Sequence, residues 1–182
     1  MSSPEADFLS LSHTAAGDAE VAALRGRTKL RRLFLSHTRV TDAGLAFVGE
    51  LQQLERLALT GTAITNAGVS CLSPLVHLES LLLGETQITD AGLVHLARLT
   101  QLKVLWLDHT AISDGGIRHL LPLRQLNRLH LMHTRITDAG LAQLAALTML
   151  ERLHLDGTAV TDQGVQQLRE NLPRLQFYRA RP

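Results

Sequence analysis

The stretch LNRLHLMHTRITDAGLAQLAALTM occupies residues 126–149, and LERLHLDGTAVTDQGVQQLRENLPR follows it at residues 150–174. Aliphatic residues stand at the same places in both segments, and ITDAGL in the first becomes VTDQGV in the second. The same pattern continues toward the N-terminus without a gap, in segments that start at residues 102, 78, 54, 30 and 6. The chain therefore repeats a 24-residue unit with the pattern LxxLxLxxTxITDxGLxxLxxL, and we number its positions 1 to 24.

The seven copies leave little of the chain outside the array. We expect residues 1–5 to form an N-terminal tail and residues 6–182 a single repeat domain, with a partial repeat or cap from residue 175. In the first copy Ala16 and Val21 replace the usual Ile and Leu, and Glu20 takes the place of a glycine. A terminal copy that departs from the consensus in this way is typical of the cap that covers the end of a repeat core.

The composition excludes several classes of protein. Hydrophobic residues make up 45% of the chain and the formal net charge is +1, which favours a folded protein and argues against a nucleic-acid partner. The single cysteine, Cys71, cannot form an internal disulfide. The sequence contains neither a signal peptide nor an apolar run long enough for a membrane span, so we expect a cytoplasmic protein without a membrane partner.

Two periodicities divide each unit. Positions 4 and 6 alternate with polar positions, as a short strand with one buried face requires. Aliphatic residues at positions 11, 16, 19 and 22 follow helical spacing, and the Thr or Ser at position 12 is a suitable N-cap for that helix. Because no copy can bury its apolar face alone, we expect the strands to stack into one parallel sheet.

This pattern resembles that of leucine-rich repeats over roughly residues 6 to 179. It is similar to the repeats of many bacterial proteins and to those of F-box proteins, and threonine where the F-box type has cysteine favours the bacterial type. The resemblance implies an α/β solenoid, or horseshoe, with a concave parallel sheet and short convex helices. It also implies a protein-interaction module rather than an enzyme.

Residues that recur in every copy are interpreted as scaffold, because an active site needs a group only once. Position 9 is threonine in all seven copies, from Thr14 to Thr158, and its hydroxyl can bond the backbone where the chain leaves the strand. Position 15 is glycine in six copies, from Gly44 to Gly164, which indicates a close approach between neighbouring helices.

Function is expected where the copies differ. Positions 3, 5 and 7 should point onto the concave face, where aromatic residues, Met and Arg are typical anchors of protein interfaces. We predict a surface centred on Trp106 that exposes the large apolar side chains of Phe34, Leu82 and Met132. The predicted partner-binding residues are Phe34, Arg56, Leu82, Trp106, Asp108, Arg128, His130, Met132, Arg152, His154 and Asp156.

An alternative concerns the histidines. His130 and His154 occupy equivalent positions on adjacent strands, with Asp156 on the same face, so a metal site or a catalytic group is conceivable. The geometry of a sheet argues against a metal site, because side chains on one face project in parallel and do not converge on a single ion. His130 and His133 are three residues apart on a strand and should point in different directions. We therefore predict no metal, and the absence of glycine-loop, HExxH, GxSxG and paired CxxC motifs predicts no cofactor and no catalysis.

The sequence thus predicts a module, monomeric by preference, that binds a protein or peptide on its concave sheet. One alternative is an effector or adaptor delivered into another cell, where the same face recruits a host factor. Another is a spacer on which concave substitutions have no effect.

Overall fold

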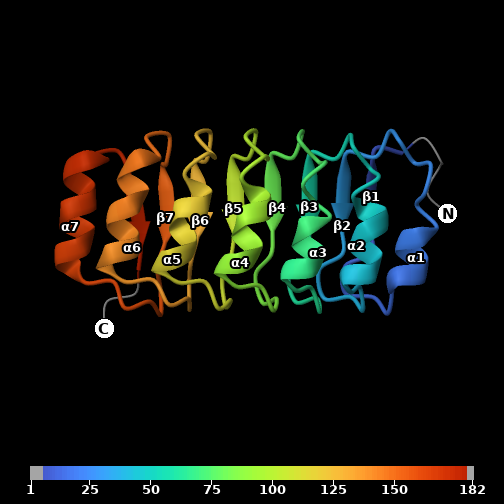
Figure 1. Ribbon diagram of the computed structural model, residues 1–182, viewed down its shortest axis with the longest axis horizontal. Coiled ribbons are helices and arrows are strands. Elements are labelled where there is room, and N and C mark those ends of the chain that lie inside the picture. The colour runs from blue at the N-terminus through green and yellow to red at the C-terminus, as the bar shows by residue number, and fades with distance from the viewer. Residues whose placement is uncertain (1–5, 180–182) are drawn as a thin grey trace.

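The computed structural model describes residues 6–179, in which short strands and helices alternate along an elongated array (Figure 1). Within that range eight strands form one parallel sheet whose spatial order is the chain order. The strands are β1 (Phe8–Ser10), β2 (Arg32–Phe34), β3 (Arg56–Ala58), β4 (Ser80–Leu82), β5 (Val104–Trp106), β6 (Arg128–His130), β7 (Arg152–His154) and β8 (Gln176–Tyr178). The leucine-rich-repeat architecture predicted from the periodicity is confirmed.

Helices cover one side of this sheet (Figure 1). The α-helices are α1 (Asp18–Ala22), α2 (Asp42–Val48), α3 (Asn66–Ser70), α4 (Asp90–Leu93), α5 (Asp114–Ile117), α6 (Asp138–Gln143) and α7 (Asp162–Asn171). Three of them continue as 3₁₀ turns, namely η1 (Val94–Leu96), η2 (Arg118–Leu120) and η3 (Leu144–Ala146). Among residues 6–179 no helix has the length and apolar character needed to cross a membrane.

The strand register keeps the 24-residue period from end to end. Leu33 pairs with Leu57 and Leu105 with Leu129, so the position-4 leucines form a continuous ladder. The last pair of strands has the same offset, which places Phe177 beside Leu153 and Tyr178 beside His154. The seventh copy therefore also spans 24 residues in the strand register, and no extra residue separates β7 from β8.

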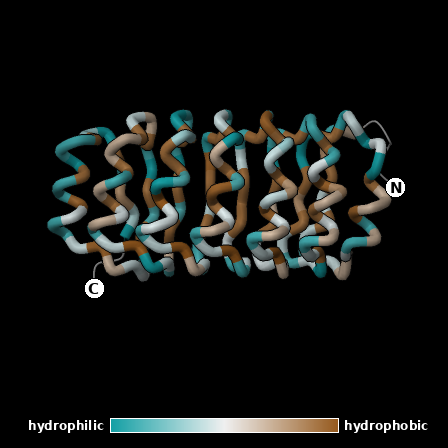
Figure 2. Tube along the Cα trace, in the orientation of Figure 1, coloured by the Kyte–Doolittle hydropathy of each residue, from teal (hydrophilic) through white to brown (hydrophobic). Residues whose placement is uncertain are grey.

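The core lies between the sheet and the helices. Position-4 leucines from Leu33 to Leu153 are completely buried, and one apolar cluster extends from Val21 to Leu175. Hydrophobic residues recur in every copy along the array (Figure 2). Each copy thus completes the core of its neighbours, as the periodicity predicts.

The recurring threonine of position 9 closes the turn after each strand. Its hydroxyl donates to the carbonyl oxygen three residues earlier, as between Thr86 Oγ1 and Leu83 O at 2.6 Å and between Thr134 Oγ1 and Leu131 O at 2.6 Å. These threonines are largely buried, so the bond satisfies a carbonyl that is shielded from water.

The recurring Asp of position 13 has a role that helix-capping rules alone do not reveal. In α5 the Asp114 carboxylate accepts the Thr137 N–H at 2.8 Å and the Thr137 hydroxyl at 2.6 Å, and Thr137 is the N-cap of the next helix. The Thr137 hydroxyl in turn accepts the Ala139 N–H. A Cβ atom on Gly140 would overlap the Asp114 carboxylate, so glycine at position 15 makes room for the Asp of the preceding copy. We call this arrangement of Asp, Thr and Gly the inter-repeat lock.

One lock differs from the others. Asn66 occupies the Asp position, and its Nδ2 donates to Thr89 Oγ1 at 2.8 Å. In the other copies the hydroxyl donates to a carboxylate and keeps its lone pairs for the helix N–H. Thr89, by contrast, makes no capping hydrogen bond to α4.

Replacing Asn66 by Asp should therefore stabilise the protein. The new carboxylate would accept a hydrogen bond from the Thr89 hydroxyl. The Thr89 oxygen would then be free to accept the Ala91 N–H, and this restored N-cap should add about 0.5–1.5 kcal/mol to the free energy of unfolding. Urea unfolding followed by circular dichroism measures the gain. The control is Gln87→Glu, which adds the same charge at an exposed site and should leave stability within about 0.5 kcal/mol. Equal effects of the two variants would contradict the cap.

Candidate partner-binding surface

The strands place two columns of side chains on the face opposite the helices. Side chains alternate along each strand, so position 4 enters the core while positions 3 and 5 face outward. The position-3 column consists of Phe8, Arg32, Arg56, Ser80, Val104, Arg128, Arg152 and Gln176. The position-5 column consists of Ser10, Phe34, Ala58, Leu82, Trp106, His130, His154 and Tyr178.

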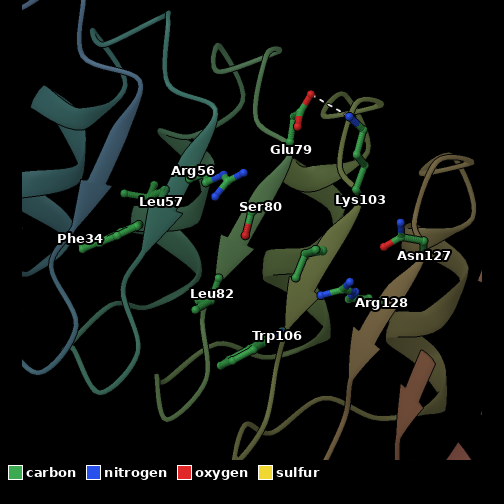
Figure 3. Close-up of a pocket in the computed structure, with 11 residues that line it drawn as sticks. Phe34, Arg56, Leu57, Glu79, Ser80, Leu82, Lys103, Trp106, Asn127 and Arg128 are labelled. Atoms are coloured by element: carbon green, nitrogen blue, oxygen red, sulfur yellow. Dashed lines mark hydrogen bonds and ion pairs between the residues drawn. The ribbon is translucent and has the colours of Figure 1, made fainter. Parts of the chain in front are cut away.

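A hollow of about 440 Å³ lies across these columns between β2 and β6. It is lined by Phe34, Arg56, Leu57, Glu79, Ser80, Leu82, Lys103, Val104, Trp106, Asn127 and Arg128. Leu82 and Trp106 project from adjacent strands, while Arg56 and Arg128 stand at opposite sides of the group (Figure 3). The hollow therefore combines an apolar centre with two cationic ends.

The apolar side chains are less exposed than the sequence predicts. Phe34, Leu82, Trp106 and Met132 are all half-buried rather than exposed. Neighbouring strands lie only ~4.8 Å apart, so large side chains on adjacent strands cover one another. Phe34 meets the Phe8 ring edge-on with a centroid distance of 5.4 Å, and Trp106 stacks on His130 at 4.5 Å.

Two buried polar atoms of the lining lack hydrogen-bond partners within the described range 6–179. They are the indole nitrogen Nε1 of Trp106 and the amide oxygen Oδ1 of Asn127. Most buried polar groups in folded proteins are hydrogen-bonded, and exceptions often mark functional sites. Both exceptions belong to residues that line the hollow.

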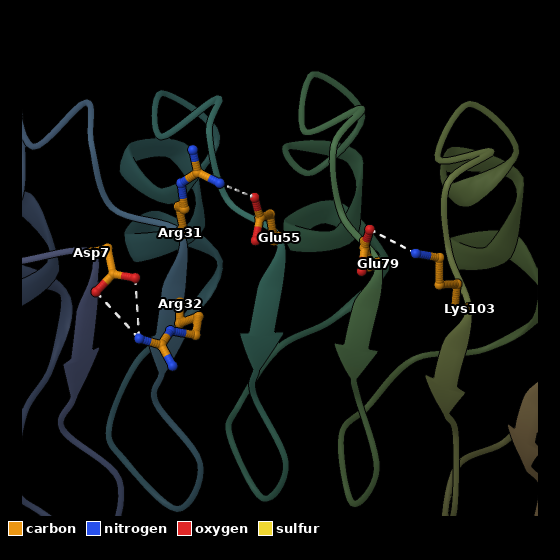
Figure 4. Close-up of polar contacts among 6 residues, drawn as sticks. All are labelled: Asp7, Arg31, Arg32, Glu55, Glu79 and Lys103. Atoms are coloured by element: carbon orange, nitrogen blue, oxygen red, sulfur yellow. Dashed lines mark hydrogen bonds and ion pairs between the residues drawn. The ribbon is translucent and has the colours of Figure 1, made fainter.

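Ion pairs neutralise some of the charges on this face and leave others. Arg31 pairs with Glu55 at 2.6 Å, Arg32 with Asp7 at 3.1 Å and Lys103 with Glu79 at 2.8 Å (Figure 4). Three exposed arginines of the position-3 column have no acidic partner in the part of the chain that the structure describes. These three are Arg56, Arg128 and Arg152.

Beyond the hollow, the position-5 column becomes a stack of four rings. Trp106 and His130 lie 4.5 Å apart between centroids, His130 and His154 3.8 Å, and His154 and Tyr178 4.3 Å. His133 belongs to a separate stack with His109 at 4.2 Å, so the two histidines of the HxxH spacing point to different places, as predicted. The ring stack extends the surface to β8.

The stacked geometry does not favour the metal alternative. Nitrogen lone pairs lie in the ring planes, so two stacked imidazoles direct them along nearly parallel planes instead of toward one ion. Within residues 6–179 no cluster of three or more His, Cys, Asp or Glu residues is arranged to hold a metal.

Asp108 has a structural partner and is only 8% exposed. Its Oδ1 accepts the Met132 N–H at 2.9 Å, and its Oδ2 lies 3.6 Å from His130 Nδ1. Asp108 therefore joins two copies and lies beside a ring of the stack, which leaves little of its side chain exposed to a partner.

The environment of His154 makes stability depend on pH. Burial, followed by the neighbouring His130 and by Arg152, lowers its pKa below the ordinary 6.5, while Asp108 and Asp156 oppose the change. The folded state thus takes up a proton less readily than the unfolded state. His154 makes its full contribution to the free energy of unfolding above pH 6.5. This contribution is lost as the pH falls from 6.5 through the lower pKa that His154 has in the folded state.

We expect the melting temperature of the wild type to fall as the pH is lowered below 6.5, and that of His154→Gln to fall less. Differential scanning calorimetry over this range measures both. His77→Gln, at an exposed convex site, is the control and should follow the wild type. A wild-type and a His154→Gln profile that run parallel would contradict the assignment.

The structure brings together only part of the predicted site. Phe34, Arg56, Leu82, Trp106 and Arg128 line the hollow, whereas His130, Met132, Arg152, His154 and Asp156 lie outside its lining. The sequence prediction misses Glu79, Lys103, Asn127 and Tyr178. Position 2 of each unit would have indicated the first three, and continuing the 24-residue register past residue 174 would have aligned Tyr178 with His154.

Comparison with known proteins agrees with this geometry. The family model described as leucine-rich repeat matches residues 51–73, 75–97, 124–145 and 146–168. Internalin C2 from Listeria monocytogenes superposes with a TM-score of 0.79 and 30% identity, covering 94% of this chain and 69% of that one. A comparison with curated proteins finds no match.

Two further solved structures show the same fold at lower identity. A leucine-rich repeat protein of Leptospira interrogans has a TM-score of 0.67 and 24% identity, over 87% of this chain and 38% of that one. Another Listeria internalin has a TM-score of 0.52 and 21% identity, over 86% of this chain and 56% of that one. The family match and the likeness to internalin C2 show that the chain belongs to the leucine-rich repeat family.

Proposed function

We propose that this chain binds a protein or peptide partner in the hollow across β2 to β6. Leucine-rich repeat proteins are generally protein-interaction modules, and the observation that supports this site is the hollow itself. It presents a half-buried Trp, Phe and Leu beside two exposed arginines, and aromatic residues and Arg are the types that typically dominate binding energy at interfaces.

Other surfaces offer a weaker basis for binding. Three other exposed large apolar residues lie in η1 and in the turns before β4 and β7, and they are scattered singly: Val94, Val76 and Met149. Single exposed apolar residues are normal on soluble proteins and need no partner. The hollow gathers its apolar and charged residues on five consecutive strands.

A selection from a random peptide library tests the proposal. Peptides displayed on phage are enriched on the wild-type chain and then compared on Leu82→Ala and on Val94→Ala, which shortens an aliphatic side chain on the helix side. We expect most enriched clones to lose binding to Leu82→Ala and to keep it on Val94→Ala. Failure to enrich any clone, or clones that bind both variants equally, would refute the concave site.

A further inference from the structure

Uncompensated charge at the two ends of the hollow indicates the chemistry of its partner. Four charged residues line it, and two of them, Glu79 and Lys103, neutralise each other at 2.8 Å. The remaining two, Arg56 and Arg128, are exposed and have no acidic partner within residues 6–179. The lining therefore has two positive charges without counter-charge.

The spacing of these arginines matches an extended peptide. Arg56 is on β3 and Arg128 on β6, three strand spacings apart, which amounts to about 14 Å. In an extended chain, residues i and i+4 point to the same side and are also about 14 Å apart. A peptide laid across the strands can thus place one carboxylate at each arginine. Guanidinium groups bind carboxylates through paired, charge-assisted hydrogen bonds.

The residues between the arginines define the rest of the peptide. Ser80 and Val104 separate Arg56 from Arg128 in the position-3 column and carry no charge. Leu82 and Trp106 stand beside them in the position-5 column. Because side chains alternate along an extended peptide, residues i+1 and i+3 would face Leu82 and Trp106 while i and i+4 face the arginines.

We infer, on the basis of the proposed function, that the partner is an extended acidic peptide segment with the pattern acidic–apolar–any–apolar–acidic, bound across β3 to β6. Its two Asp or Glu side chains contact Arg56 and Arg128, and its apolar side chains pack on Leu82 and Trp106. Arg152 is on β7, one strand beyond Arg128, and does not line the hollow. The two acidic contacts are therefore assigned to Arg56 and Arg128.

The peptides enriched on the wild-type chain provide the test. Clones that depend on Leu82 should carry this pattern, and moving one acidic residue by two positions in a synthetic copy should weaken binding roughly tenfold. The double variant Arg56→Gln with Arg128→Gln should weaken binding by at least about tenfold. Arg98→Gln, an exposed arginine on the helix side, should change it less than about twofold. Raising the salt concentration from about 0.05 M to about 0.5 M should also weaken it.

The outcomes separate the two proposals. Leu82-dependent clones that lack acidic residues, or that bind the double arginine variant as tightly as the wild type, would overturn the acidic-peptide inference and leave the concave site in place. Clones that bind Leu82→Ala as tightly as the wild type would overturn both the concave site and the acidic-peptide inference. Circular dichroism of the double variant should match the wild type, since both side chains are exposed and neither forms an ion pair among residues 6–179.

Discussion

Gly140→Ala is expected to destabilise the protein by about 2–3 kcal/mol, although the residue lies in helix α6, where alanine normally stabilises by about 1 kcal/mol. The added Cβ would overlap the Asp114 carboxylate. Moving that carboxylate breaks its bonds to the Thr137 N–H and hydroxyl, and each hydrogen bond to a charged group contributes about 1.5–3 kcal/mol. Urea unfolding followed by circular dichroism measures the change.

The same substitution should behave differently once the carboxylate is gone. In an Asp114→Ala background the carboxylate is gone and only the Cα of residue 114, at 3.1 Å from the new Cβ, stays close, so the cost of Gly140→Ala should fall to about 1 kcal/mol or less. Gly17→Ala is a control without steric overlap, because its Cβ would have no neighbour closer than 3.8 Å, and as an N-cap substitution it should cost only about 0.5–1 kcal/mol in either background. Equal costs of Gly140→Ala in the two backgrounds would contradict the inter-repeat lock.

Trp106→Ala is expected to lower the affinity for a peptide selected on the wild-type chain by about 30-fold or more. The indole lines the centre of the hollow, and truncation removes the largest apolar surface available to a ligand there. Trp106→Phe retains a ring and should lose less than about fivefold. Isothermal titration calorimetry of each variant measures the affinities.

Stability must be separated from binding in this comparison, because Trp106 also stacks on His130. We expect the melting temperature of Trp106→Ala to fall by only about 5 °C or less, since the side chain is half-buried on the open face of the sheet. Met149→Ala, at a residue 59% exposed in the turn before β7 and outside the lining of the hollow, should leave affinity and melting temperature nearly unchanged. An equal loss of affinity in Met149→Ala and Trp106→Ala would contradict a concave site.

The fold could be predicted almost completely from the sequence, because the same 24 residues specify it seven times. Positions 4 and 6 predict the strand, and the Thr or Ser of position 12 predicts the helix start that Thr41 and Thr137 confirm. The reason for glycine at position 15 was less accessible. It depends on an Asp from the preceding copy, a contact across 23 to 26 residues that local capping rules do not contain.

The candidate site could be predicted only in outline. Strand alternation places Phe34, Leu82 and Trp106 on the concave face, but it gives neither their mutual burial nor the hollow between β2 and β6. Asp108 was predicted as a surface group because a period of two says nothing about hydrogen bonds to the next copy. Likewise, pairing of Lys103 with Glu79, which leaves Arg56 and Arg128 uncompensated, depends on side-chain geometry that spacing does not fix.

Acrylamide quenching of Trp106 fluorescence, with and without a saturating selected peptide, tests the concave site most directly. Trp106 is the only tryptophan in the chain and lines the hollow, so its emission reports on that surface alone. A ligand seated across β3 to β6 should cover the indole and reduce the quenching constant about twofold or more. A quenching constant that stays the same when the peptide is bound would show that the partner binds elsewhere.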